Sequence, residues 1–303
     1  MKFLVFLFLF ISFNALAQFD EKGMITNTTI GDIGKPEIGN YYLPAYKEVA
    51  VYSAPSIKSK TSYKTTSFKD SLKVLEVLNK QVVFKKVYGN WCKVSFPFKG
   101  KRFIGYVPSQ FLATIYLNQQ DVRYLLLIDK YANHQFTMNL KILKNFEMVG
   151  FYTFSPSVSY AYNPIESDTI NKAMRGYLDM ALFTNKGLDS IDNIIRVTTG
   201  IDACGYWNGS QYLLLKNFKV KAQIEDGGVV DGDVFSDGYE ITFPIDTLGQ
   251  PNSVSKHYYH WERNEDDTTA NTWESQVKFK WQNYQFIKTD SIYSSKKVNV
   301  SGN

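Results

Sequence analysis

Short apolar segments of strand length recur along the chain, separated by turn-forming residues. They are rich in Val, Ile, Tyr and Phe, a composition typical of β-strands. The segments are 72–78, 82–87, 91–96, 103–107, 121–128, 135–143 and 148–154. Within one of them apolar and polar residues alternate, as in a strand with one buried face. The alternating apolar residues are Phe136, Met138, Leu140 and Ile142. The pattern therefore predicts a mainly β protein with at most one or two helices.

One segment, 168–183, fits two kinds of element. Its apolar residues have helical spacing behind a capping residue, Asp168 or Thr169. Gly176 weakens a helix, and residues 178–183 alone have the length and composition of a strand. The sequence leaves both possibilities open.

Turn-forming pairs mark the expected connections between strands. Gly89–Asn90 and Lys99–Gly100 are typical of turns, and Asn208–Gly209 is a strong signal for a tight hairpin. The segment 206–215 contains this last pair, and 280–288 repeats its order of Trp, polar turn and aromatic residue. Two copies suggest repeated β units, and they predict that the strand after Cys204 enters a hairpin at Asn208–Gly209.

The N-terminus reads MKFLVFLFLFISFNALAQ and has the organisation of a secretory signal peptide. Lys2 is followed by the apolar run 3–13 and then by the small-residue site Ala15–Ala17. The run is too short for the roughly 30 Å of a bilayer core. We therefore expect residues 1–17 to be removed and the protein to be exported, to the periplasm or the extracellular space.

Charge and composition narrow the possible partners. The 303 residues carry a formal charge of +5, which becomes +4 once Lys2 is removed, and the charges are scattered. A nucleic-acid surface would need clustered basic residues. No later segment is apolar enough to span a membrane. Neither a nucleic-acid partner nor a membrane span is expected.

Changes in amino-acid composition and in the pattern of apolar segments divide the chain into regions. After the signal peptide we expect a linker or extended leader at 18–44, a small barrel at 45–115, a larger β-rich domain at 120–289 and a flexible tail at 290–303.

Residues 49–113 resemble the bacterial SH3-like domain, SH3b. The matching elements occur in the family's order: Val51–Ser56, Leu72–Leu75, Asn90–Val94, Gly105–Val107 and Phe111–Leu112. Tyr52 stands where the family has Arg, and Tyr106 where it has Trp. The resemblance covers about a fifth of the chain and implies a small SH3-like β-barrel.

The resemblance also implies a binding role for the barrel. Such modules bind cell-wall glycan or peptide, or dock onto another protein, and they are not catalysts. The candidate ligand-binding residues are Tyr52, Trp91 and Tyr106. Large aromatic side chains of this kind either fill a barrel core or form a recognition face, and the sequence leaves both open for Trp91 and Tyr106.

Gly200–Gly205 is similar to the Asp-Cys-Ser-Gly nucleophile site of NlpC-type cell-wall peptidases, with Ala203 inserted between Asp and Cys. A thiol nucleophile needs a base within hydrogen-bond reach. That resemblance would make Cys204 the nucleophile, with His257 or His260 as its base. Alternatively, Cys204 pairs with Cys92 in a disulfide, or the two remain separate, packed thiols. The two histidines are three residues apart and would face opposite sides of a strand, so no metal site is expected from them.

Within the acidic segment 225–241, residues 233–241 resemble the calcium loops of FG-GAP or VCBS-type repeats. Its candidate ligands are Asp231, Asp233, Asp237 and Glu240, since calcium prefers oxygen ligands from a flexible loop. An exposed hairpin, in which Asp and Gly supply turn geometry, explains the same residues.

Six Asp-Ser or Asp-Thr pairs resemble the O-glycosylation sequon that one group of Gram-negative bacteria uses on exported proteins. A glycan on these hydroxyls would require them to lie on the surface. The same pairs are favoured at turns and caps. The hydroxyl residues are Ser71, Thr169, Ser190, Thr247, Thr268 and Ser291.

Together these patterns favour an exported, non-enzymatic binding or scaffold protein of a Gram-negative envelope. Its expected partner is cell-wall glycan or peptide, or an envelope protein, and no cofactor is expected. The alternatives are a cysteine-dependent peptidase and a calcium-stabilised β-repeat module.

Overall fold

The computed structural model describes most of the chain after the predicted signal peptide. The described residues are 22–30, 36–98, 100–132, 135–156, 176–201, 204–232, 234–265 and 268–299. Of these residues 69% are in β-strands, and their helical content is one 3-10 turn, η1, at Ser109–Phe111. The predicted mainly β fold is thus confirmed. In this part of the chain no helix is long and apolar enough to cross a bilayer.

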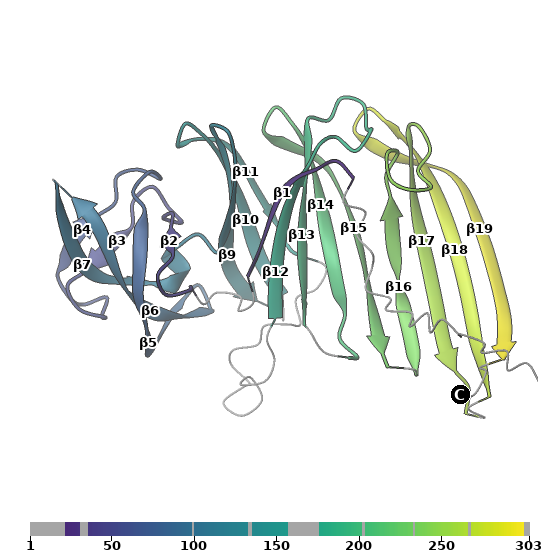
Figure 1. Cartoon of the computed structure of the whole chain (residues 1–303), viewed down its shortest axis with the longest axis horizontal. Coiled ribbons are helices and arrows are strands. Elements are labelled where there is room, and N and C mark those ends of the chain that lie inside the picture. The colour runs from purple at the N-terminus through teal and green to yellow at the C-terminus, as the bar shows by residue number, and fades with distance from the viewer. Residues whose placement is uncertain are drawn as a thin grey trace, which may run out of the picture.

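The first of three antiparallel sheets contains the region predicted as a barrel (Figure 1). Its order is β2-β5-β6-β7-β3-β4. The strands are β2 (Tyr41–Tyr42), β3 (Ala50–Tyr52), β4 (Thr61–Lys64), β5 (Leu72–Phe84), β6 (Val87–Phe98) and β7 (Lys101–Pro108). Their shared core contains Val51, Leu72, Val74, Cys92, Val94 and Val107.

The other two sheets contain the rest of the chain. The four-stranded sheet, in the order β11-β10-β9-β8, comprises β8 (Ile115–Gln119), β9 (Val122–Ala132), β10 (Gln135–Lys144) and β11 (Glu147–Phe154). The nine-stranded sheet begins with β1 (Met24–Ile30), β12 (Gly176–Phe183), β13 (Asn193–Ile201) and β14 (Asn208–Lys216). It continues through β15 (Lys219–Asp231), β16 (Phe235–Thr242), β17 (Ser253–Arg263), β18 (Thr269–Gln282) and β19 (Gln285–Asn299).

Two segments predicted to lie outside the folded domains are strands. The predicted leader, 18–44, contains β1, which pairs with β12. The predicted tail, 290–303, contains residues 290–299 of β19, which pair with β18 as far as Asn299. Both are edge strands of the nine-stranded sheet. Their polar composition gave no strand signal, because an edge strand with exposed faces does not need alternating apolar residues. Residues 168–175 lie outside the described residues, but 176–183 of the ambiguous segment is the strand β12.

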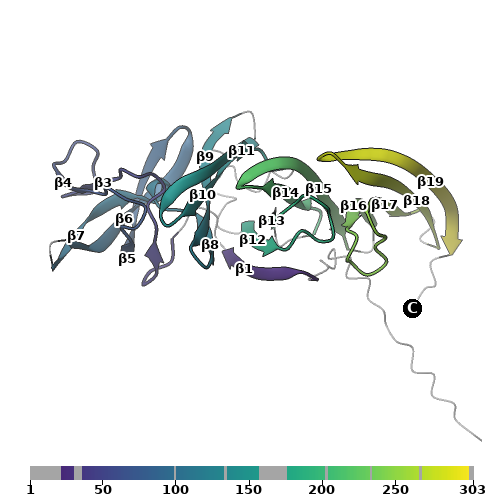
Figure 2. The same cartoon turned by 90° about the horizontal axis from the view of Figure 1, so that it is seen from above.

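The four-stranded sheet packs face to face on β12–β14, and its other face lies toward the six-stranded sheet (Figures 1 and 2). Phe136, Met138, Leu140 and Ile142 all lie in the first of these two cores, as their alternation predicts. In β9 the run 124–128 is buried on both faces, so its sequence is continuously apolar. This arrangement forms three layers, with β9 and β10 in the middle.

Lys141 is a buried polar residue between the six-stranded sheet and the middle layer. It is 6% exposed, and its Nζ donates to the Ala45 carbonyl at 2.6 Å and lies 4.3 Å from the centre of the Tyr46 ring. Burial lowers the pKa of Lys141 to about 8. The buried cation thus connects β10 to the segment between β2 and β3 of the six-stranded sheet.

Tight hairpins have positive φ at both turn residues, as type I′ turns require. The pairs are Lys85–Lys86, Asn145–Phe146, Asn217–Phe218 and Asn283–Tyr284. The predicted hairpin at Asn208–Gly209 is wrong, because these residues begin β14 and pair with Gly228 and Gly227. Gly89–Asn90 likewise lies inside β6. The predicted Trp-turn-aromatic unit at 280–288 does form a hairpin, through Asn283–Tyr284.

The nine-stranded sheet separates between β15 and β16. These strands pair only from Gly227–Asp231 to Phe235–Tyr239, so the first half of β15 and the end of β16 diverge. A second apolar cluster fills this wedge. It contains Phe183, Leu188, Ile191, Tyr212, Leu214, Phe243, Val254 and Trp281. The wedge cluster therefore joins the sandwich half of the sheet to the outer half, β16–β19.

Candidate interaction surface

The outer half of the sheet has partly exposed side chains along both of its faces. Figure 1 shows β16–β19 extending away from the four-stranded sheet that covers β12–β14. Most residues of β16, β17 and β18 are neither buried nor fully exposed. A sheet of this kind is stabilised mainly by contacts between side chains on neighbouring strands.

A row of aromatic side chains, here called the aromatic strip, crosses one face of this half. It consists of Trp207, Tyr239, Tyr258, His260, Trp273 and Tyr293. Ring centres lie 5.9 Å apart for Trp207–Tyr239 and 5.3 Å apart for Tyr239–Tyr258. The row continues with His260–Trp273 at 5.5 Å and Trp273–Tyr293 at 6.4 Å. Tyr258 and His260 share β17 two residues apart, which places them on one face and makes the row continuous.

Charged groups of both signs border the aromatic strip. Lys256 Nζ lies 3.5 Å from the centre of the Tyr239 ring and 5.2 Å from that of Tyr258. Burial lowers the pKa of Lys256, and the nearby carboxylate of Glu225 opposes that shift. The Tyr239 hydroxyl donates to Glu225 Oε1 at 3.2 Å, while His260 Nδ1 lies 3.5 Å from Asp237 Oδ1.

Glycines make room for the large side chains near the junction of β15 and β16. A Cβ on Gly227 would lie 2.7 Å from Trp207 Nε1, so Trp207 occupies the space that a side chain would need. On the opposite face, Gly228 and Gly238 pair with each other, and the Tyr259 hydroxyl lies over both. Aromatic cover of this type compensates for the missing side chains of glycine in a strand.

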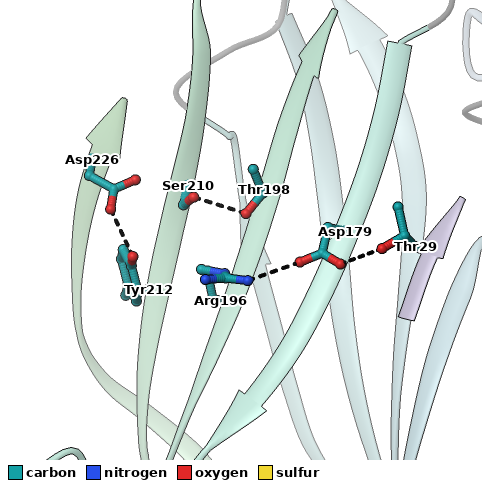
Figure 3. A network of polar contacts seen from close by, with 7 residues as sticks. All are labelled: Thr29, Asp179, Arg196, Thr198, Ser210, Tyr212 and Asp226. Carbon is teal, nitrogen blue, oxygen red and sulfur yellow. Dashed lines mark hydrogen bonds and ion pairs between the residues drawn. The ribbon is translucent and has the colours of Figure 1, made fainter. Parts of the chain in front are cut away.

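A polar network on the inner half of the sheet is the other cluster of chemically active groups (Figure 3). Thr29 of β1 donates to Asp179 Oδ1 at 2.6 Å, and Arg196 Nη2 lies 3.3 Å from Asp179 Oδ2. Next to Arg196, the hydroxyls of Thr198 and Ser210 are 2.9 Å apart. The network thus links four adjacent strands, β1 and β12–β14.

Asp226 on β15 completes the network. Its Oδ2 accepts a 2.7 Å hydrogen bond from the Tyr212 hydroxyl, and its side chain lies opposite Ser210. Burial raises the pKa of Asp226 to about 6, although hydrogen bonds from Tyr212 and Ser210 oppose the rise. Because the groups on β13–β15 are buried and the Thr29–Asp179 hydrogen bond extends the contacts to β1, we assign the network to the structural connection between β1 and β15.

The raised pKa of Asp226 predicts a pH-dependent stability. The ordinary pKa of an aspartate carboxyl is 3.8. Between about pH 4 and 6 the folded state therefore holds a proton on Asp226 that the unfolded state has lost. The free energy of unfolding due to this group therefore falls as the pH rises through that window, by roughly 2–3 kcal/mol. Asp226→Asn removes this contribution. Urea unfolding at pH 4 and pH 7 should show the wild type losing stability relative to the variant, whereas parallel pH profiles would contradict the assignment.

The predicted barrel residues do lie together. Tyr52 is directly opposite Tyr106 on the paired strands β3 and β7, and the Tyr52 ring meets Trp91 edge-on at 5.5 Å. Trp91 is only 2% exposed, whereas Tyr52 and Tyr106 are partly exposed. The sequence left open whether Trp91 fills the core or forms a recognition face, and its burial matches that of a core residue. The accessible residues of this cluster are Tyr52 and Tyr106.

The predicted cysteine and histidine residues do not form a cluster. Cys204 is exposed in the turn before β14, next to Gly205, whose amide donates to Val230 of β15. His257 and His260 lie on β17, three positions from β14 in the sheet order. Three strand spacings amount to about 14 Å. Both cysteines are free, with Cys92 buried in the core of the six-stranded sheet, so the proposed Cys92–Cys204 disulfide is not present.

The calcium candidates are also dispersed among the described residues. Asp231 ends β15, whereas Asp237 and Glu240 lie three apart on β16 and so on opposite faces. Asp233 lies outside the described residues. Across the ranges that the structure describes, no three His, Cys, Asp or Glu side chains form a group suited to a metal ion.

The hydroxyls of the Asp-Ser and Asp-Thr pairs lie near the surface where the structure describes them. Ser190, Thr247, Thr268 and Ser291 are exposed, Ser71 is partly exposed, and Thr169 lies outside the described residues.

Two of the aspartates in these Asp-Ser and Asp-Thr pairs accept hydrogen bonds from backbone amides. Asp70 accepts hydrogen bonds from the amides of Thr66 and Ser67, and Asp246 accepts one from the amide of Phe243. These carboxylates stabilise turns, as the alternative interpretation expected.

The sequence predicts no ligand-binding role for any residue of the aromatic strip, and it considers His260 only as a base for Cys204. Residues 258–261, Tyr-Tyr-His-Trp, place ring-bearing side chains on both faces of a strand, which is only a weak signal for such a row. Compared with known proteins, the chain matches no protein-family model and has no significant match among curated proteins or solved structures.

Proposed function

We propose that the protein is an exported, non-enzymatic binding protein of the bacterial envelope that holds a protein partner on its aromatic strip. The observation that carries the proposal is the continuous row of partly exposed Tyr, Trp and His rings across β16–β19. Tyr and Trp are enriched at the energetic centres of protein interfaces, because they bury large areas and retain a polar group. Export rests on the signal-like N-terminus.

The chemistry bordering the strip favours a protein over a neutral glycan. Lys256, Glu225 and Asp237 place both signs of charge within the same surface. A partner surface with apolar side chains and opposite charges complements such a mixture, and electrostatic complementarity gives specificity. The tyrosine pair of the SH3b-like barrel, Tyr52 and Tyr106, supplies a second aromatic contact that can bind cell-wall material.

The test compares variants of the two faces of β17 and β18. Tyr258→Ala and Trp273→Ala remove rings of the aromatic strip. Trp261→Ala is the control, because Trp261 lies on β17 three positions after Tyr258 and therefore on the opposite face of the sheet. Envelope proteins cross-linked to the wild type would be identified, purified and titrated against each variant. We expect a partner whose affinity falls at least about tenfold with either strip variant and changes less than about twofold with Trp261→Ala.

The same proteins would be pelleted with purified peptidoglycan. Pelleting that depends on Tyr258 and Trp273 would overturn the protein partner in favour of a glycan. Binding that is lost only with Tyr52→Ala or Tyr106→Ala would move the site to the barrel. If no purified partner distinguishes the strip variants from Trp261→Ala, the strip has no binding role.

A further inference from the structure

The outer edge of β19 is the longest strand edge that the described sheets leave unpaired. β19 pairs with β18 on one side and ends the order of the nine-stranded sheet on the other. It has 15 residues, whereas the strands that end the sheets elsewhere have 8 or fewer. An unpaired edge presents a row of N–H and C=O groups that can pair with another chain.

The side chains at the middle of this edge are unusually apolar for an exposed strand. Ile292 is 55% exposed and Tyr293 is 66% exposed, and they point to opposite faces of the sheet. Serines flank them at 291, 294 and 295, so small side chains leave the backbone accessible. The irregularity in the β18–β19 ladder lies before Asp290, which leaves 290–299 in regular pairing.

We propose that a second copy of this chain pairs with this edge, antiparallel and about a two-fold axis at Tyr293. Symmetric antiparallel pairing places each residue opposite one on the same face of the second copy. In this register Tyr293 lies opposite its own copy, Ser291 lies opposite Ser295, and Asp290 lies opposite Lys296. The two nine-stranded sheets then form one continuous sheet through seven residues of each strand, 290–296.

Charge complementarity selects this register. The two-fold axis creates the Asp290–Lys296 pair twice, and Asp290 also lies opposite Lys278 within its own chain. Each carboxylate therefore lies between two lysines, one from each copy. Moving the axis to Ile292 would instead place Lys288 opposite Lys296 and leave Asp290 opposite Ser294. Like charges directly opposite each other destabilise a strand pair.

The paired edge also continues the aromatic strip. Tyr293 is its last ring and stacks on Trp273 at 6.4 Å. Directly opposite residues of antiparallel strands have Cα atoms roughly 4.5–5.5 Å apart. The two Tyr293 side chains would therefore be neighbours on one face, and two strips would join across the dimer. This inference stands independently of what the strip binds.

Sedimentation equilibrium of the full chain over a range of concentrations tests the proposal. An interface of seven paired residues is small, so we expect a dimer that dissociates in the micromolar range. D290K or K296D alone would place like charges across the axis and weaken dimerisation at least about tenfold, whereas D290K/K296D together would restore it to within about threefold. Circular dichroism checks that each variant is folded.

A disulfide test fixes the register. Y293C, in a C204S background that removes the exposed native thiol, should form a covalent dimer on mild oxidation, because the two Cα atoms fall within disulfide range. S295C in the same background is the control, since residue 295 lies opposite residue 291 and should not cross-link. A monomer at every concentration, a double variant that is not restored, or equal cross-linking of both cysteine variants would overturn the proposal.

Discussion

Replacing Trp281 with alanine should lower the free energy of unfolding by about 3–5 kcal/mol. Trp281 is 6% exposed in the wedge cluster, where its ring lies 4.9 Å from Phe286. Its indole N–H also donates to the Asp189 carbonyl at 2.9 Å, which connects β18 to the loop after β12. Alanine would leave both a large cavity and an unbonded carbonyl. Guanidinium unfolding followed by circular dichroism would measure the loss.

Trp273→Ala is the matched control, because Trp273 lies on the same strand but is partly exposed in the aromatic strip. Its loss removes stacking on His260 and Tyr293, contacts of the kind worth about 1 kcal/mol. Equal effects of the two substitutions would mean that the wedge cluster does not hold the two halves of the sheet together.

Lys186→Met should be similarly destabilising, again by about 3–5 kcal/mol. Lys186 Nζ lies 2.7 Å from Asp246 Oδ1, and the two side chains are only 3% and 4% exposed. Methionine keeps the packing against Phe183 and Phe243 but leaves a carboxylate buried without its cation. Removing one member of a buried pair costs far more than the pair itself contributes.

The chain provides a closely matched control for this pair. Lys216 and Asp192 are also 2.7 Å apart, and Asp192 accepts a backbone amide at 2.7 Å just as Asp246 does. Here, however, the side chains are 32% and 42% exposed. Water can solvate the remaining carboxylate, so Lys216→Met should change stability little. If both substitutions had the same effect in chemical unfolding, burial would not explain the cost.

The strands with one or two buried faces could be predicted from sequence. The alternation Phe136, Met138, Leu140, Ile142 identifies the buried face of β10, and the apolar run before Asp129 identifies β9. The outer strands lacked such a signal. Residues of β17 such as Tyr258, Tyr259 and Trp261 are aromatic on both faces, because neither face is covered by another sheet.

Turns and long-range neighbours were the hardest features to predict. Asn208–Gly209 has the composition of a hairpin, yet the turn lies at Asn217–Phe218, where Asn and an aromatic residue both adopt positive φ. The aromatic strip could not be foreseen because its members come from separate strands. Only the register of β16–β19 places Tyr239 opposite Tyr258, and His260 opposite Trp273.

The position of β1 has a consequence for the order in which the protein can be completed during synthesis. The Thr29 hydroxyl of β1 donates a hydrogen bond to Asp179, which lies 150 residues later in the chain. β1 is therefore synthesised long before the strand with which it pairs. At roughly 5–20 residues per second, that interval lasts about 8–30 s. The six-stranded sheet can fold while β1 is still unpaired, because its strands, between 41 and 108, are contiguous in the chain. β1 therefore cannot take its place in the nine-stranded sheet until the ribosome has passed residue 183.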